Sequence, residues 1–119
     1  MISTLAAFGG GPASVKNLRD LRANGTRVLY GTDLGNSRAT NIQSDEITLL
    51  LAAGMDGTAI VKAGTSIPAA FLGLDDLGSL EVGKRASFLV LEADPSIEPH
   101  TLSKPVAVYV DGAMTSAGL

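Results

Sequence analysis

Asp33 is the residue whose type and position in the sequence offer the most definite chemistry. It follows residues 27–31, a short run without clean alternation, of the kind that forms a strand buried on both faces. A carboxylate beside a metal-bound water can ligate the metal, accept the water's proton and deliver it to a leaving amine. An ordinary turn or helix-cap aspartate fits the same position. The residue alone therefore leaves both interpretations open.

Three polar residues follow Asp33 on the same loop: Asn36, Ser37 and Arg38. A guanidinium group binds a carboxylate through two parallel hydrogen bonds, so Arg38 can pair with a substrate carboxylate. A solvated loop arginine is the alternative.

Two other features suggest a binding site, but neighbouring residues argue against that role in each case. Residues 78–84 reproduce most of a phosphate-binding loop, but Arg85 stands where a Ser or Thr would bind Mg²⁺. Leu80 and Val82 alternate as in a strand, so we interpret this segment as a strand and its turn. The single histidine, His100, has no cysteine or second histidine to share a metal with. We interpret it as a surface residue.

Composition narrows the class of protein. The 119 residues are 45% hydrophobic and 18% charged, which suits a folded domain with a buried core. The net charge is −3, and no basic stripe is present for nucleic acid. No stretch approaches the roughly 20 apolar residues that span a membrane. The lack of cysteine and of a basic segment at the start fits a cytoplasmic protein. In a longer parent protein, the true N-terminus would lie elsewhere.

The first part of the chain has the pattern of a β-α-β unit. Residues 2–8 form an apolar segment with strand or buried-helix character. Ser14 is a suitable cap for a helix whose apolar residues lie three and four apart, and Asn24-Gly25 ends it. The strand over 27–31 completes the unit.

The rest of the chain changes from helix to strand. We predict helices that begin near Ser44, at the cap residue Asp56 and around Pro68, the last ended by Gly73. Asp111-Gly112 predicts a hairpin turn. The β-forming runs are residues 79–82, 87–92 and 106–110.

Several stretches, weak one by one, resemble a known family when they are taken in order. Together they are similar to the C-terminal end of the amidohydrolase superfamily, especially its imidazolonepropionase- and prolidase-like members. One departure is Ser87, which follows Ala86 where the family usually has an acidic residue. The matching stretches are residues 17–25, 28–33, 49–55, 67–74, 77–86, 89–95 and 110–112.

The resemblance implies an α/β fold: a partial β/α (TIM-type) barrel made of the last one or two βα units, followed by a small β segment. In such a barrel the last strand ends at Asp33, and side chains there point toward the active site. We therefore expect residues 1–76 to be the C-terminal part of the barrel. Residues 77–119 are expected to be the β segment of a composite outer domain.

The resemblance also implies a metal-dependent hydrolase of carbon–nitrogen bonds, acting on a cyclic amide or a small dipeptide-like substrate. Asp33 would be its catalytic residue and one metal ligand, and Asn36 and Arg38 would contact substrate. The family's metal-binding histidines lie on earlier strands that this sequence lacks. A divalent metal, with zinc favoured, is thus expected in the intact parent enzyme, and none in this chain alone. We expect the chain alone to be inactive.

A non-enzymatic role is the alternative. Two parallel strands taken from a closed barrel expose hydrogen-bonding edges and an apolar face. We therefore expect the chain to form a homo-oligomer or to bind the missing N-terminal portion of a barrel. In either case it would be a structural module rather than an enzyme.

Overall fold

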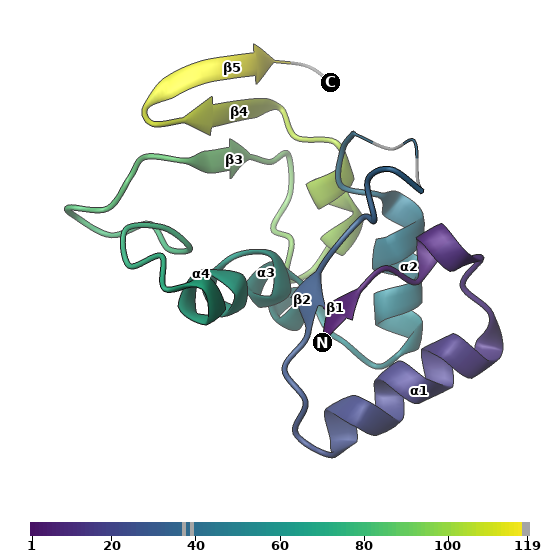
Figure 1. The fold of residues 1–119 in the computed structure, drawn as a ribbon. Coiled ribbons are helices and arrows are strands. Elements are labelled where there is room, and N and C mark those ends of the chain that lie inside the picture. Colours follow the sequence, from purple (N-terminus) through teal and green to yellow (C-terminus); the bar gives the residue numbers. More distant parts are fainter. Residues whose placement is uncertain (37, 39, 118–119) are drawn as a thin grey trace.

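The computed structural model describes residues 1–36, 38 and 40–117 (Figure 1); Ser37 lies outside them. The fold is α/β, with a two-stranded parallel sheet and a three-stranded antiparallel sheet. In chain order the elements are β1 (Ile2–Ser3), the 3-10 helix η1 (Ala6–Phe8), α1 (Pro12–Ala23), β2 (Leu29–Tyr30), α2 (Ser44–Ala52), α3 (Gly57–Gly64), α4 (Ser66–Leu72), β3 (Phe88–Val90), the 3-10 helix η2 (Pro99–Ser103), β4 (Ala107–Val110) and β5 (Ala113–Ala117).

The predicted β-α-β unit is confirmed, with shorter strands than expected. β1 and β2 run parallel, so that Ile2 lies opposite Leu29 and Ser3 opposite Tyr30. The chain leaves the sheet after Ser3 and turns into η1. α1 begins at Pro12, earlier than the expected start, because proline has no N–H to lose and its fixed φ suits the first helical turn.

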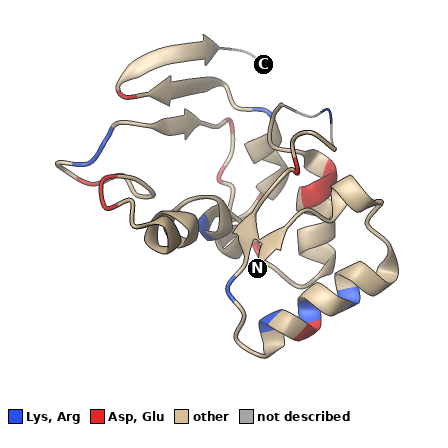
Figure 2. Ribbon diagram, viewed as in Figure 1, with Lys and Arg blue, Asp and Glu red and all other residues tan. Residues whose placement is uncertain are grey.

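Two arginines of α1 fasten this helix to α2. Figure 2 shows Lys and Arg gathered along α1, while acidic residues colour the start of α2. The Arg19 guanidinium donates to Ala52 O at 2.5 Å, and that of Arg22 donates to Ala53 O at 3.3 Å. Both carbonyls lie at the C-terminal end of α2, where the helix leaves acceptors without intrahelical partners. Cations are favoured at this end of a helix.

The C-terminal sheet confirms the predicted hairpin and corrects one predicted strand. Asp111 (φ 51°) and Gly112 (φ 81°) both adopt the left-handed conformation that a tight two-residue hairpin requires. The expected strand over 79–82 is wrong. Arg85 N donates to Asp76 O at 2.9 Å, which folds residues 76–85 into a closed loop instead of an extended ladder.

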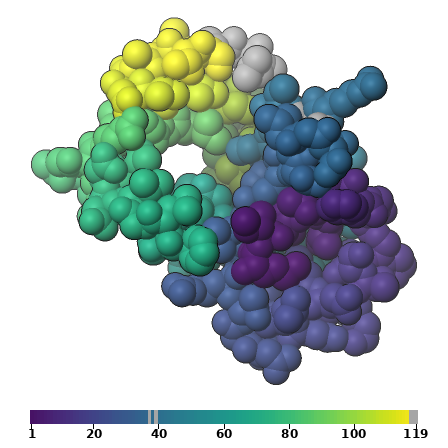
Figure 3. All heavy atoms as spheres, in the orientation of Figure 1, coloured from purple at the N-terminus to yellow at the C-terminus, as the bar shows by residue number. Residues whose placement is uncertain are grey.

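An opening separates the antiparallel sheet from the helices below it. In Figure 3 it passes between the C-terminal strands and the α3–α4 region. A hollow of about 380 Å³ lies at this place, lined by Tyr30 of β2, by residues of α3 and by residues of β3 and β4. The two sheets are therefore joined through η2 and the loops, with incomplete packing between them.

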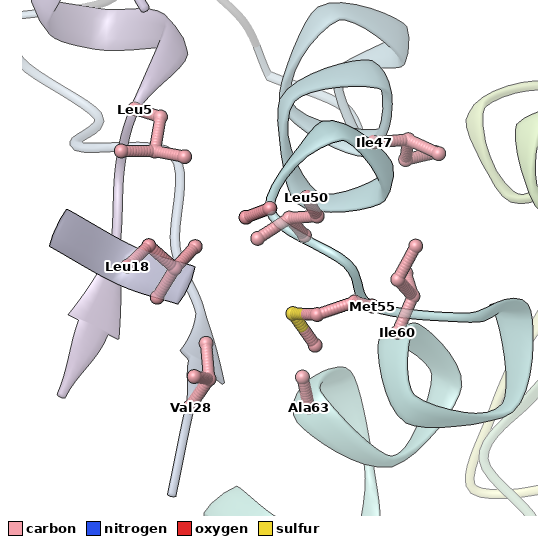
Figure 4. Packing of buried hydrophobic residues seen from close by; sticks show 9 residues of the cluster. Leu5, Leu18, Val28, Ile47, Leu50, Met55, Ile60 and Ala63 are labelled. Atoms are coloured by element: carbon pink, nitrogen blue, oxygen red, sulfur yellow. The ribbon is translucent and has the colours of Figure 1, made fainter. Parts of the chain in front are cut away.

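The hydrophobic core lies wholly in the first part of the chain (Figure 4). It joins α1, α2 and α3 to the strands, and Leu18, Ile47 and Leu50 have no exposed surface. Among residues 70–116, none is buried. The core cluster consists of Leu5, Leu18, Val28, Ile47, Leu50, Ala53, Met55, Ile60 and Ala63.

Candidate functional site

Asp33 lies just beyond the C-terminal end of β2, in a tight turn. Its backbone is left-handed, with φ at 52°, a conformation that aspartate and asparagine adopt more readily than most residues. Asn36 closes the turn: its backbone N–H donates to Asp33 O at 3.1 Å, and its Nδ2 donates to Asp33 Oδ2 at 3.0 Å. The Asp33 side chain is half-buried. The structure thus brings Asn36 and Asp33 together.

Arg38 is exposed and lines a cleft of about 1130 Å³. Thr32 and Leu34, the residues on either side of Asp33, also line this cleft. Its opposite wall comes from the segment that ends η2 and enters β4, which includes Lys104. Of the predicted site residues that the structure describes, Arg38 therefore lines a hollow large enough for a small substrate, whereas Asp33 and Asn36 are not among its wall residues.

A buried carboxylate that the sequence did not single out lies behind this loop. Glu46 is 1% exposed, and its carboxylate accepts hydrogen bonds from Ser3 Oγ at 2.5 Å and from Ala6 N at 2.6 Å. It thereby fastens the end of β1 to α2. One signal was available: Glu46 precedes Leu50 by four residues and Ala53 by seven, which places it on the apolar face of the helix.

Tyr30 makes the matching connection from β2. Its hydroxyl accepts a hydrogen bond from Gln43 N at 2.8 Å, at the start of α2. Burial raises the pKa of the Tyr30 hydroxyl above its ordinary 10.0; the Gln43 hydrogen bond opposes this, and the charge of Glu46 adds to it. The side chain therefore stays neutral at physiological pH. Glu46 and Tyr30 together hold both strand ends against α2, beside the Asp33 loop.

The two remaining features from the sequence are His100 and the loop of residues 78–84, and their side chains contact nearby protein groups. His100 is exposed, as expected, and its Nδ1 lies 2.9 Å from Ser44 Oγ. In the loop that resembles a phosphate-binding motif, Lys84 Nζ donates to Ser79 Oγ at 2.6 Å and lies 3.5 Å from a Glu81 oxygen. The lysine is thus engaged within its own loop.

The described residues do not form a metal site on their own. No group of three or more His, Cys, Asp or Glu side chains is placed to hold an ion within residues 1–36, 38 and 40–117. A protein zinc site uses about three or four protein ligands, and Asp33 offers one carboxylate. In the same part of the chain, no helix has the length and hydropathy that crossing a bilayer requires.

Solved structures share this fold. A Xaa-Pro dipeptidase with methionine bound in its active site superposes with a TM-score of 0.79 at 24% identity over 90% of this chain. An amidohydrolase gives 0.74 at 27% identity over 90%, and a proposed prolidase from Bifidobacterium longum gives 0.73 at 34% identity over 88%. The chain spans about a quarter of each solved protein, 26%, 27% and 27% respectively.

The sequence comparisons identify the family. None of the curated protein sequences matches the chain significantly. The profile of the amidohydrolase family, in contrast, matches residues 12–115, which is nearly the whole sequence. This match includes the turn with Asp33, the helix with Glu46 and most of the antiparallel sheet. The chain belongs to the amidohydrolase family.

Proposed function

We propose that this chain is the C-terminal part of a metal-dependent hydrolase that cleaves carbon–nitrogen bonds. The observation that carries the proposal is the place of Asp33: a half-buried carboxylate on the loop that follows the parallel strand β2, within the stretch that matches the amidohydrolase profile. In β/α barrels, catalytic side chains come from the C-terminal ends of strands. Residues 1–76 would then supply the last barrel units, and residues 77–119 part of a composite outer domain.

Asp33 would act in proton transfer. Its Oδ2 is held by Asn36, so one carboxylate oxygen has a fixed direction while the carboxylate as a whole stays accessible. In that position it can accept a proton from the attacking water and return it to the leaving amine. A divalent metal, with zinc favoured, would supply the activation of that water. Asp33 would be one of its ligands, and histidines outside this sequence the others, so we expect the chain alone to be inactive.

The substrate would be a small amide, and a dipeptide is favoured. Two of the structural neighbours are described as a Xaa-Pro dipeptidase and a proposed prolidase. A dipeptide carries a terminal carboxylate, and Arg38 on the cleft wall offers a guanidinium that can pair with it. Asn36 would contact substrate from the same turn that carries Asp33.

A structural role is the second candidate, and the open sheet supports it. Within the described residues, β1 and β2 form a sheet of two strands, so each has an outer edge without a strand partner. Unpaired edges bind other strands. The chain would then complete a barrel that another polypeptide supplies, or associate with a second copy as a homo-oligomer.

Reconstitution separates the two candidates. The chain would be co-expressed with a histidine-bearing N-terminal amidohydrolase segment, and the complex assayed on a Xaa-Pro dipeptide with and without Zn²⁺. We expect zinc-dependent hydrolysis that Asp33→Asn lowers by a factor of about 10³ or more. Asp75→Asn, at an exposed loop residue, is the matched control and should leave the rate unchanged.

The alternative outcomes are distinct. A complex that forms but hydrolyses nothing would support the structural role. Equal rates for Asp33→Asn and the unmodified chain would remove Asp33 from the chemistry.

A further inference from the structure

The loop that carries Asp33 is joined at its two ends by a side-chain hydrogen bond. The loop leaves β2 after Tyr30 and enters α2, whose N-cap residue is Gln43 (Figure 1). The backbone N–H of Gln43 donates to the Tyr30 hydroxyl at 2.8 Å. Because this bond connects the last residue of the strand to the residue before the helix, it sets the distance between the two ends of the loop.

Both ends of the loop are also fastened to β1. Tyr30 lies opposite Ser3 in the parallel sheet. Ser3 Oγ donates to a carboxylate oxygen of Glu46 at 2.5 Å. Glu46 lies in the first turn of α2, three residues after Gln43. Strand pairing, two hydrogen bonds and one helical turn therefore link these four residues into a closed ring.

The start of the loop is held by close packing. A Cβ added at Gly31 would lie 2.7 Å from Ile2 Cγ2 and 3.0 Å from Ser3 O, so the backbone that leaves β2 passes directly against β1. Asp33 follows two residues later. At the far end of the loop, in contrast, the hydroxyl of Tyr30 is the group that binds the backbone.

We propose that Tyr30 is a positioning residue of the candidate site. Its hydroxyl holds the far end of the loop in place, and the loop presents the Asn36 amide that orients the Asp33 carboxylate. A displacement of about 1 Å in a catalytic group can lower a rate by roughly a hundredfold. The inference rests on the proposed function, in which Asp33 transfers a proton, but the order of the loop can be measured without any reaction.

Tyr30→Phe removes the hydroxyl and little else. The aromatic ring keeps its packing against the hydrophobic core, and the similar volume of phenylalanine leaves no large cavity. Tyr109→Phe is the matched control, because it deletes the same group from the other tyrosine of the sequence. Tyr109 lies on β4, where its ring stacks on Phe88.

Amide hydrogen exchange of the chain, measured residue by residue by NMR, tests the order of the loop. The reporter is the Asn36 amide, which donates to Asp33 O. We expect Tyr30→Phe to exchange about three- to tenfold faster there, the range that the loss of one hydrogen bond supports. The Ala53 amide, which bonds at the end of α2, should exchange at an unchanged rate. Tyr109→Phe should change neither.

Kinetics of the reconstituted complex test the consequence for the site. With a Xaa-Pro dipeptide and Zn²⁺, we expect Tyr30→Phe to lower kcat about tenfold or more. KM should rise as well, because the same loop carries Arg38, whereas a smaller amount of folded complex would lower kcat at an unchanged KM. Tyr109→Phe should behave as the unmodified chain.

Three results would overturn the inference. Unchanged exchange at Asn36 would mean that other contacts, such as the packing of Ile42 against the core, suffice to hold the loop. Equal acceleration at Asn36 and Ala53 would mean that the hydroxyl acts through overall stability. Unchanged kcat and KM in Tyr30→Phe, beside an inactive Asp33→Asn, would show that the order of the loop does not matter to the reaction.

Failure of the proposed function gives a different result. In that case no complex hydrolyses the dipeptide, while Asn36 in Tyr30→Phe still exchanges faster than in the unmodified chain. The role of Tyr30 in ordering the loop would then stand, and the assignment of proton transfer to Asp33 would fall.

Discussion

The two halves of the molecule are held together by different means. The first half, from β1 to α3, has a continuous core in which Leu18, Ile47 and Leu50 are completely buried. The second half, from β3 to β5, has no buried residue between positions 88 and 116. It depends on strand pairing, on the stacked Phe88–Tyr109 pair and on the Arg85–Asp111 ion pair.

This difference shows which half of the described chain lacks a packed core. Three paired strands need an apolar face packed against another element to be stable alone. Here Phe88 and Tyr109 on one face of the sheet, and Leu89 and Val108 on the other, line the hollow of about 380 Å³ instead of a packed core. Exposed apolar side chains also gather after α3, among them Phe71, Leu80 and Val82. Packing of a buried core therefore holds the first half together, whereas strand pairing and surface contacts hold the second.

The largest expected effect comes from comparing the truncation of an apolar side chain in each half. Leu50→Ala removes a fully buried side chain from the core and should lower the free energy of unfolding by about 3 kcal/mol. Val108→Ala, in the half-buried β4, should cost less than about 1 kcal/mol, because little packing surrounds that side chain. Urea denaturation followed by circular dichroism measures both. Equal costs would show that the second sheet has a packed core of its own.

A second test concerns the buried carboxylate. Glu46→Ala leaves Ser3 Oγ and Ala6 N without their acceptor, and should lower the free energy of unfolding by about 2 kcal/mol. Asp45→Ala, at the exposed neighbouring position, should cost less than about 1 kcal/mol, the typical value of a charge near a helix end. Hydrogen exchange at the Ala6 amide gives a local measurement. Unchanged protection in Glu46→Ala would mean that this carboxylate does not hold the end of β1.

Local signals in the sequence predicted the elements that local contacts fix. Asp56 caps α3 by accepting a hydrogen bond from Ala59 N at 2.7 Å, and Gly73 ends α4 in the left-handed conformation. Asp111 and Gly112 form the expected turn. The strand predicted over residues 79–82 is wrong because the alternation of Leu80 and Val82 cannot reveal that Arg85 N donates a hydrogen bond to Asp76 O.

Of the arrangement around the candidate site, the sequence predicted only that Asp33 follows the end of a strand. The position of Asp33 after a buried strand follows from the short apolar run that precedes it. Glu46 was missed because its partners, Ser3 and Ala6, lie 43 and 40 residues away in the sequence. The hollow of about 380 Å³ has walls from α3, β3, β4 and η2, and the periodicity of a single segment cannot predict that these elements lie together.

A third test examines the joint between the halves at Gly57. A Cβ there would lie 2.2 Å from Pro95 O and 2.8 Å from two atoms of Ser96, so backbone would have to move. Gly57→Ala should lower the free energy of unfolding by roughly 1–2 kcal/mol, as overpacking does. Gly64→Ala, where the nearest atom is at 4.0 Å, should stabilise the helix slightly. Faster exchange at the Ile97 amide, which donates to Asp94 O, would locate the displacement. If Gly57→Ala is neutral, the halves are not tightly joined here.

The smallest expected effect comes from the surface ion pair of the second half. Arg85 donates to both carboxylate oxygens of Asp111, at 2.7 and 2.8 Å, and this guanidinium lowers the pKa of that carboxyl below its ordinary 3.8. A lowered folded-state pKa gives stability that is present above pH 3.8 and is lost as the pH falls through the folded-state value.

Asp111→Asn keeps the left-handed turn, which asparagine tolerates, and removes the charge. The difference in stability between the two proteins should therefore be present at pH 7 and shrink below pH 3.8. Because both groups are exposed, salt should weaken it. A difference that persists unchanged at low pH would trace the effect to the hydrogen bonds of the turn instead of the charge, and the second half would then rely on its hairpin backbone alone.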